Sequence, residues 1–203
     1  PRSAFGHIFS RQLSLLVEIG ILQAEISEHA LMRLQLAVED NDIITHPEGD
    51  VASLALNLMQ NPIAVLGPEE LMPAVNRFKN QLNENSSRFA RIGAFPEMNH
   101  NESVAWGGVG DDQDPSAPDQ ALLLLSWDGI HPRVRHRMDW FVSNCPTELA
   151  WKIHGDGETL LECLLHLCIM TDWLSIALAL LHGKDPSAID PIISLKEYLS
   201  QID

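Results

Sequence analysis

The stretch Ala121–Trp127, ALLLLSW, decides the fold, because five apolar residues follow one another with no polar residue between them. A strand buried on both faces of a parallel sheet has this pattern, whereas a strand with one solvated face alternates. Three further segments contain strands: Phe89–Ala94, Glu148–Gly155 and Pro62–Leu71, in which we expect a strand, a Gly-Pro turn and a helix start. Strands that alternate with helices predict an α/β fold with a mostly parallel sheet.

The rest of the chain has the patterns of helices and one loop. Apolar residues spaced three and four apart predict two amphipathic N-terminal helices, followed by a shorter helix with Asp50 as its N-cap. Gly107–Gln120 is rich in Gly, Pro and Asp, which predicts a mobile loop. The expected helices are Phe5–Leu22, Ile26–Asp40, Asp50–Met59, one that ends near Asn83, a short one from Asn101, Pro132–Ser143, Leu160–Leu181 and Ala188–Leu199.

Composition limits the classes of partner. The chain has 203 residues, with 28 acidic against 13 basic ones, for a formal net charge of −15. This charge argues against nucleic acid or an anionic membrane as a partner, although a local basic pocket for an anionic metabolite remains compatible with it. Three cysteines do not form a disulfide framework and favour a reducing, cytoplasmic compartment.

The most apolar segment, Leu160–Leu181, is long enough to span a bilayer. Glu162, His166 and Asp172 would each be costly in hydrocarbon. We therefore expect a core helix.

The segment Glu97–Glu102, EMNHNE, places two glutamates, two asparagines and a histidine directly after the predicted strand Phe89–Ala94. Ligands of parallel sheets bind beyond the carboxyl ends of the strands, where this segment is expected to lie. Asn101 is a suitable N-cap, which puts Glu102 in the first turn of a helix, where the dipole and free N–H groups favour an ionised carboxylate. Such a carboxylate is a competent general base.

Other interpretations of the polar segments stay open. Asn99, Asn101 and Glu102 can simply cap a helix while His100 is solvated. A metal site has little support, because the segment lacks the HExxH spacing and no third ligand is recognisable. The stretch Asp128–Arg137, DGIHPRVRHR, is either an anion or acid–base site at a strand end or an ordinary solvated helix start.

Taken together, several motifs resemble the bifunctional phosphoglucose/phosphomannose isomerases of bacteria and archaea, two-lobed proteins of the sugar isomerase (SIS) type. The resemblance runs from Arg2 to Lys196. It implies an SIS-type three-layer α/β/α fold, in which residues 1–60 are a helical linking segment from a first lobe and residues 61–203 are the second SIS domain. The motifs are PRSAFG (Pro1–Gly6), RFKNQLNEN (Arg77–Asn85), PEMNHNE (Pro96–Glu102), HPR (His131–Arg133) and GKDPSAIDPIISLK (Gly183–Lys196).

The resemblance also implies a reaction, the interconversion of glucose 6-phosphate, and in some members mannose 6-phosphate, with fructose 6-phosphate. Glu102 matches the base that moves a proton between C1 and C2, and Arg2 matches the arginine near the enediolate. Lys196 matches a lysine of the C-terminal helix that reaches the site. His131 is assigned to the histidine that assists ring opening, which the neighbouring subunit lends, with His136 as the alternative.

The remaining expectations concern ligands and partners. Asn99, His100 and Asn101 are expected to contact the substrate. Neither a metal nor another cofactor is required, since one carboxylate, one histidine and one or two cations suffice for this chemistry. The expected partners are a phosphosugar and a second copy of the chain, in a homodimer with a shared active site.

The chain also departs from the family pattern. Ser87 stands where the family usually has a lysine, Thr171 replaces a glycine, and Ser187 replaces a threonine. No Ser/Thr-rich phosphate-binding loop precedes Arg2, so we expect the chain to be the later portion of an isomerase, weak or inactive by itself. The alternative is a non-catalytic SIS-type module that binds a phosphosugar, regulates or dimerises.

Overall fold

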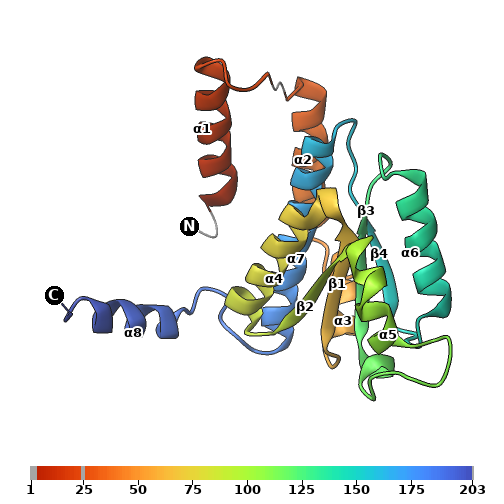
Figure 1. Cartoon of the computed structure of the whole chain (residues 1–203). Helices are drawn as coiled ribbons and strands as arrows, with labels where there is room; N and C mark the ends of the chain where they lie inside the picture. Colours follow the sequence, from red (N-terminus) through yellow and green to blue (C-terminus); the bar gives the residue numbers. More distant parts are fainter. Residues whose placement is uncertain (1–3, 24–25, 203) are drawn as a thin grey trace.

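The computed structural model describes residues 4–23 and 26–202 and shows a four-stranded sheet between two layers of helices (Figure 1). The strand order is β2-β1-β3-β4, and every pairing is parallel. Every residue of the two central strands, β1 and β3, is buried, which confirms the prediction made from the apolar run of β3. The strands are β1 Ile63–Pro68, β2 Ala90–Phe95, β3 Ala121–Ser126 and β4 Ala150–His154.

The helices largely follow the predicted ones. The predicted turn between β1 and the next helix and the predicted cap of α3 are corrected here. The expected turn at Gly67-Pro68 is wrong, because both residues continue β1 and pair with Ala94 and Phe95 of β2. Asp50 is the first helical residue of its helix and not the N-cap, which is Gly49. The α-helices are α1 Phe5–Glu18, α2 Glu28–Asp40, α3 Asp50–Leu58, α4 Met72–Ser86, α5 Glu102–Trp106, α6 Pro132–Asn144, α7 Leu160–Leu181 and α8 Asp190–Leu199, and the 3-10 turns are η2 Glu69–Leu71, η3 Glu97–His100 and η4 Ala117–Asp119.

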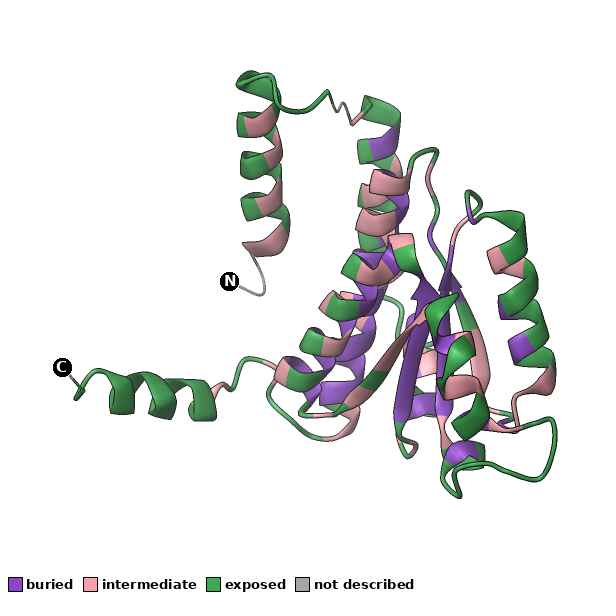
Figure 2. Ribbon diagram, in the orientation of Figure 1, coloured by how far each residue is buried: buried purple, intermediate pink, exposed green. Residues whose placement is uncertain are grey.

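The two faces of the sheet bury separate cores, which Figure 2 shows as purple segments in the centre of the molecule. Val65 and Leu123 point to the face covered by α3, α4 and α7. Leu66 and Leu124 point to the opposite face, where Trp106 of α5 and Phe141 of α6 cover them. Alternate residues of each central strand therefore enter different cores, as the pleat of a strand requires.

Helix α7 is long and apolar enough to cross a membrane by length and composition alone. In this structure it packs against α2, α3 and α4. A row of polar contacts joins it to α4: Arg77 Nη2 lies 2.5 Å from Asp172 Oδ2, Gln81 Nε2 donates to Asp172 Oδ1 at 3.0 Å, and Asn85 Nδ2 donates to Ser175 Oγ at 2.7 Å. Asp172, one of the three residues that argued against a membrane helix, thus forms an ion pair that joins α7 to α4.

Helices α1 and α8 project from the rest of the molecule and are mostly exposed (Figures 1 and 2). Neither contains a buried residue, although both carry large apolar side chains. The exposed apolar residues are Ile8, Leu15 and Val17 on α1, and Ile192, Ile193, Leu195, Tyr198 and Leu199 on α8.

Glu162 in the first turn of α7 connects this helix to α2. Its Oε2 accepts from Arg33 Nη2 at 2.6 Å and from the backbone N–H of Glu158 at 2.9 Å. The hydrogen bond from Glu158 N–H and the Arg33 guanidinium lower the pKa of Glu162. The ionised carboxylate thus stabilises the fold at neutral pH, and this contribution is lost as the pH falls through the lowered pKa.

We expect Glu162→Gln to lower the thermal midpoint at pH 7 by about 2–4 °C. The difference from the wild type is expected to shrink below about pH 4, where the ordinary carboxyl group is also protonated. Glu158→Gln is the matched control, because Glu158 pairs with the same Arg33 but its side chain is 73% exposed. Thermal melts between pH 3 and pH 7 test this, and a deficit that is independent of pH would contradict it.

Candidate active site

Glu102 is the first residue of α5, directly after β2 and the 3-10 turn η3. Asn101 is the N-cap of α5, and its Oδ1 accepts the Glu102 N–H at 2.6 Å. This cap was predicted from the sequence and is confirmed. The Asn101 side chain therefore fixes the backbone at Glu102, which is a different role from the expected contact with a substrate.

The Glu102 side chain lies over the face of β2 that α5 covers. Its Oε2 is 3.1 Å from Arg91 Nη2, and the side chain is 28% exposed. A Cβ atom at Gly93 would lie 3.4 Å from Oε1 and 3.5 Å from Oε2, so the carboxylate rests close to the strand backbone. The guanidinium compensates the negative charge of the carboxylate in this half-buried place.

The other members of the EMNHNE segment differ in exposure. Asn99 is half-buried, and its Nδ2 lies 3.4 Å from Ser103 Oγ, while its buried Oδ1 has no hydrogen-bond partner. His100 is exposed at the end of η3. The Asn99 oxygen is thus buried without a donor, and the solvated position of His100 agrees with the alternative interpretation of this residue.

His131 is the N-cap of α6, at the carboxyl end of β3. Its Nδ1 accepts the Arg133 N–H at 3.2 Å. In the neutral ring this hydrogen bond places the proton on Nε2, which points away from the cap. Within residues 4–23 and 26–202, no hydrogen bond or ion pair joins His131 to Glu102.

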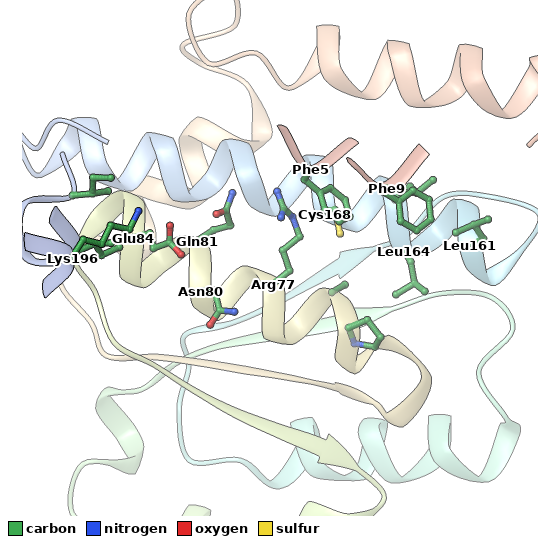
Figure 3. A pocket seen from close by; sticks show the side chains of 15 residues that line it. Phe5, Phe9, Arg77, Asn80, Gln81, Glu84, Leu161, Leu164, Cys168 and Lys196 are labelled. Carbon is green, nitrogen blue, oxygen red and sulfur yellow. The ribbon is translucent and has the colours of Figure 1, made fainter. Parts of the chain in front are cut away.

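Lys196 of α8 lines an open cavity of about 680 Å³ to which α1, α4, α7 and α8 contribute side chains (Figure 3). Glu102 is not among the residues that line this cavity. Arg77 and Glu84 of α4 give it a charged floor, and Phe5 and Phe9 of α1 an apolar wall. The chain by itself therefore does not bring Lys196 to Glu102, and Arg2, the other predicted cation, lies outside the described residues.

Two titratable groups of α7 are poor candidates for chemistry: Cys168, which lines the cavity, and Asp172, which pairs with Arg77. Burial raises the pKa of the Cys168 thiol to about 12, so this thiol stays protonated and is no nucleophile at neutral pH. Burial also raises the pKa of Asp172, against the opposing effect of Arg77 and Gln81. No group of three His, Cys, Asp or Glu side chains is placed to hold a metal ion within the part of the chain that the structure describes.

Arg91 is the residue that the sequence reasoning missed. Its guanidinium carbon lies 4.8 Å from the centroid of the Trp106 ring, in addition to the ion pair with Glu102. The signal that could have found it was the alternation along β2, which puts Arg91 and Gly93 on the same face as the buried Phe95.

Residues 48–199 match the model of the family described as "Bacterial phospho-glucose isomerase C-terminal SIS domain". The chain belongs to this family. Two relatives of this SIS domain carry the name bifunctional phosphoglucose/phosphomannose isomerase. The one from Aquifex aeolicus is 30% identical over 99% of this chain and 59% of its own length. The one from Caldicellulosiruptor bescii is 26% identical over 100% of this chain and 60% of its own length.

Solved structures confirm the SIS-type fold. A glucose-6-phosphate isomerase like protein from Thermus thermophilus superposes with a TM-score of 0.61 at 16% identity, covering 86% of this chain and 58% of that one. The C-terminal domain of glucosamine-fructose-6-phosphate aminotransferase from Francisella tularensis superposes with a TM-score of 0.58 at 11% identity, covering 78% of this chain and 45% of that one. The α3 side chains Val51, Ala55 and Leu58 pack in the same core as α4 and α7, and the family match begins at residue 48, ahead of α3.

Proposed function

We propose that this chain supplies the proton-transfer residues of a phosphosugar aldose–ketose isomerase. The substrates are glucose 6-phosphate, and epimeric substrates such as mannose 6-phosphate, in exchange with fructose 6-phosphate. The observation that carries the proposal is the placement of Glu102. The residue follows the carboxyl end of β2, the Asn101 cap fixes its backbone, and Arg91 holds its carboxylate over that strand. The names of the curated relatives support the same reaction class.

The proposed reaction begins when His131 assists opening of the sugar ring by proton transfer at the ring oxygen. Glu102 then removes the proton from C2 of the aldose, and the electron pair forms the double bond of a cis-enediolate. The hydroxyl proton of O2 passes to O1 as Glu102 returns its proton to C1, so that C2 becomes the carbonyl carbon of the ketose. A cation stabilises the oxygen that gains negative charge, and Arg2 and Lys196 are proposed for this role.

A homodimer with a shared site is part of the proposal. Among the described residues of one chain, no hydrogen bond or ion pair joins His131 or Lys196 to Glu102, and α1 and α8 expose apolar side chains that a partner can cover. An interface of this kind allows a second copy to deliver the missing groups. We place the enzyme in the cytoplasm, in central phosphosugar metabolism, with neither nucleic acid nor membrane as a partner.

A non-catalytic SIS-type module is the second candidate. The separation of Lys196 from Glu102 favours it, as does the apolar surface of α1 and α8, which fits a dimerisation or regulatory role. The chain also spans only 59% and 60% of the two curated relatives. A module of this kind binds fructose 6-phosphate without converting it.

A coupled assay separates the two functions. Formation of glucose 6-phosphate from fructose 6-phosphate is measured with the complete polypeptide that the gene encodes and with residues 1–203 alone. We expect turnover by the complete polypeptide and a rate about a hundredfold lower for residues 1–203 alone. The phosphate-binding loop is expected in the first lobe, and the binding energy of the substrate phosphate contributes to the rate. Equal rates would refute the need for a further lobe, and binding without turnover in either protein would support the module.

The shared site predicts complementation between two inactive variants. His131→Asn is expected to lower kcat/KM by about a hundredfold, because ring opening loses its acid–base group. In mixed dimers of His131→Asn and Glu102→Gln chains, one site in each heterodimer combines an intact histidine with an intact glutamate. Co-expression is therefore expected to restore about a quarter of the wild-type rate. No recovery in purified heterodimers would place both residues in one subunit.

A further inference from the structure

The two oxygens of the Glu102 carboxylate have different surroundings. Oε2 is enclosed, without an aligned hydrogen bond, and its nearest cation is Arg91 Nη2 at 3.1 Å. No hydrogen bond or ion pair joins Oε1 to any residue that the structure describes, and the side chain as a whole is 28% exposed. A base that removes a carbon-bound proton needs one oxygen that is not engaged by another residue, and Oε1 is the oxygen that Arg91 leaves unpaired.

Arg91 packs against the edge of the core, although its side chain is 40% exposed. Its guanidinium stacks over the ring of Trp106 at 4.8 Å, which is a favourable cation–π distance. Trp106 is 1% exposed and meets Phe141 of α6 edge-on, with ring centroids 5.5 Å apart and planes at 90°. The guanidinium that faces Oε2 thus packs on Trp106, which in turn packs on Phe141 of α6.

Gly93 provides the space in which the carboxylate lies. A Cβ atom there would be 2.8 Å from Leu66 Cδ2 and would also contact both Glu102 oxygens. The absence of this atom lets Glu102 lie against β2 and within reach of Arg91, which is two residues earlier on the same face.

We propose that Arg91 is a positioning residue for the proton transfer: it holds Oε2 of Glu102 and thereby directs Oε1 toward the substrate. This inference rests on the proposed function of Glu102 and extends it. Arg91 acts through Glu102 and needs no contact with the sugar. Since an ångström of misplacement at a reacting atom can cost about two orders of magnitude in rate, the pairing has a measurable consequence.

Kinetics of Arg91 variants test the inference in the complete polypeptide. Arg91→Ala is expected to lower kcat for fructose 6-phosphate by about 10- to 100-fold, with KM changed less than about twofold. Arg91→Lys keeps the charge and is expected to recover part of the loss, and millimolar ethylguanidinium is expected to rescue Arg91→Ala but not Arg91→Lys. Lys184→Ala is the control, because it removes one exposed positive charge away from α5 and is expected to match the wild type.

A substrate-free measurement tests the contact itself. Urea unfolding of Arg91→Ala, Glu102→Gln and the double variant gives the coupling between the two side chains. We expect the effect of Arg91→Ala on the unfolding equilibrium constant to be at least about threefold larger in the wild-type background than in the Glu102→Gln background.

The outcomes separate the two hypotheses. A wild-type rate in Glu102→Gln would sink the proposed function and, with it, this inference. Loss of rate in Glu102→Gln together with a normal kcat in Arg91→Ala would overturn the inference alone. A raised KM at unchanged kcat would assign Arg91 to substrate binding and would also overturn it, as would the absence of coupling in urea.

Discussion

Glu102→Gln is expected to lower kcat for fructose 6-phosphate by about a thousandfold or more, with KM little changed. Glutamine keeps the shape of the side chain but cannot accept a proton from C2 at neutral pH, so the variant loses an interaction made only in the transition state. The measurement is a coupled assay on the complete polypeptide, with substrate binding followed separately by calorimetry.

Glu97→Gln is the matched control for this variant. Glu97 belongs to the same EMNHNE segment but is exposed at the start of η3. We expect it to retain the wild-type rate. A Glu102→Gln enzyme with more than about a tenth of that rate would remove Glu102 as the base.

Arg77→Met is expected to destabilise the fold by about 2–3 kcal/mol at pH 7, because it leaves the half-buried carboxylate of Asp172 without its cation. The two side chains are 17% and 30% exposed, and their closest N–O distance is 2.5 Å. Arg77 also stacks on Phe5 at 4.0 Å, so the variant is expected to loosen α1 as well. Urea unfolding measures the loss.

The pH dependence of this loss has a definite sign. Burial raises the pKa of Asp172 above its ordinary value, so this group favours the folded state at low pH and loses that contribution as the pH rises through the folded pKa. Without Arg77, no positive charge in the described part of the chain holds the pKa of Asp172 down, so its upward shift grows. The loss of unfolding free energy in Arg77→Met is therefore expected to shrink on acidification to about pH 4.

Lys79→Met is the control, since Lys79 lies two residues further along α4 without an ion pair among the described residues. We expect Lys79→Met to lower the free energy of unfolding by less than about 0.5 kcal/mol. A deficit of Arg77→Met that stays constant with pH would show that lost packing, and not the charge of Asp172, causes the instability.

The layers of the fold follow from local sequence. The apolar run of β3 identified a strand buried on both faces, and the short apolar segment around β1 behaved in the same way. Asn101 was recognisable as a cap because its side chain bonds a neighbouring backbone N–H, which depends on no distant contact. The turn at Gly67-Pro68 was wrong because β2 pairs with these residues, and tertiary pairing outweighs a local turn preference.

The surroundings of Glu102 depend on how α5 folds back over β2. Nothing in the spacing of Arg91 and Glu102 requires them to meet, since the contact depends on Gly93 and on the burial of Trp106 beneath α6. The positions of His131 and Lys196 relative to Glu102 are likewise not set by local pattern. The cap geometry of His131 orients its ring, but α8 extends away from the sheet (Figure 1).

Isomerisation in D₂O reports directly whether Glu102 moves a proton between C1 and C2. Fructose 6-phosphate and glucose 6-phosphate are incubated with the complete polypeptide and followed by NMR. With the wild type, solvent deuterium is expected to accumulate at C1 of the ketose and C2 of the aldose over repeated turnovers, and with Glu102→Gln at neither. Incorporation in the wild type reports exchange of the proton on Glu102 with solvent before its return to carbon. Deuterium incorporation that survives in Glu102→Gln at the wild-type rate would contradict the assignment of Glu102 as the base.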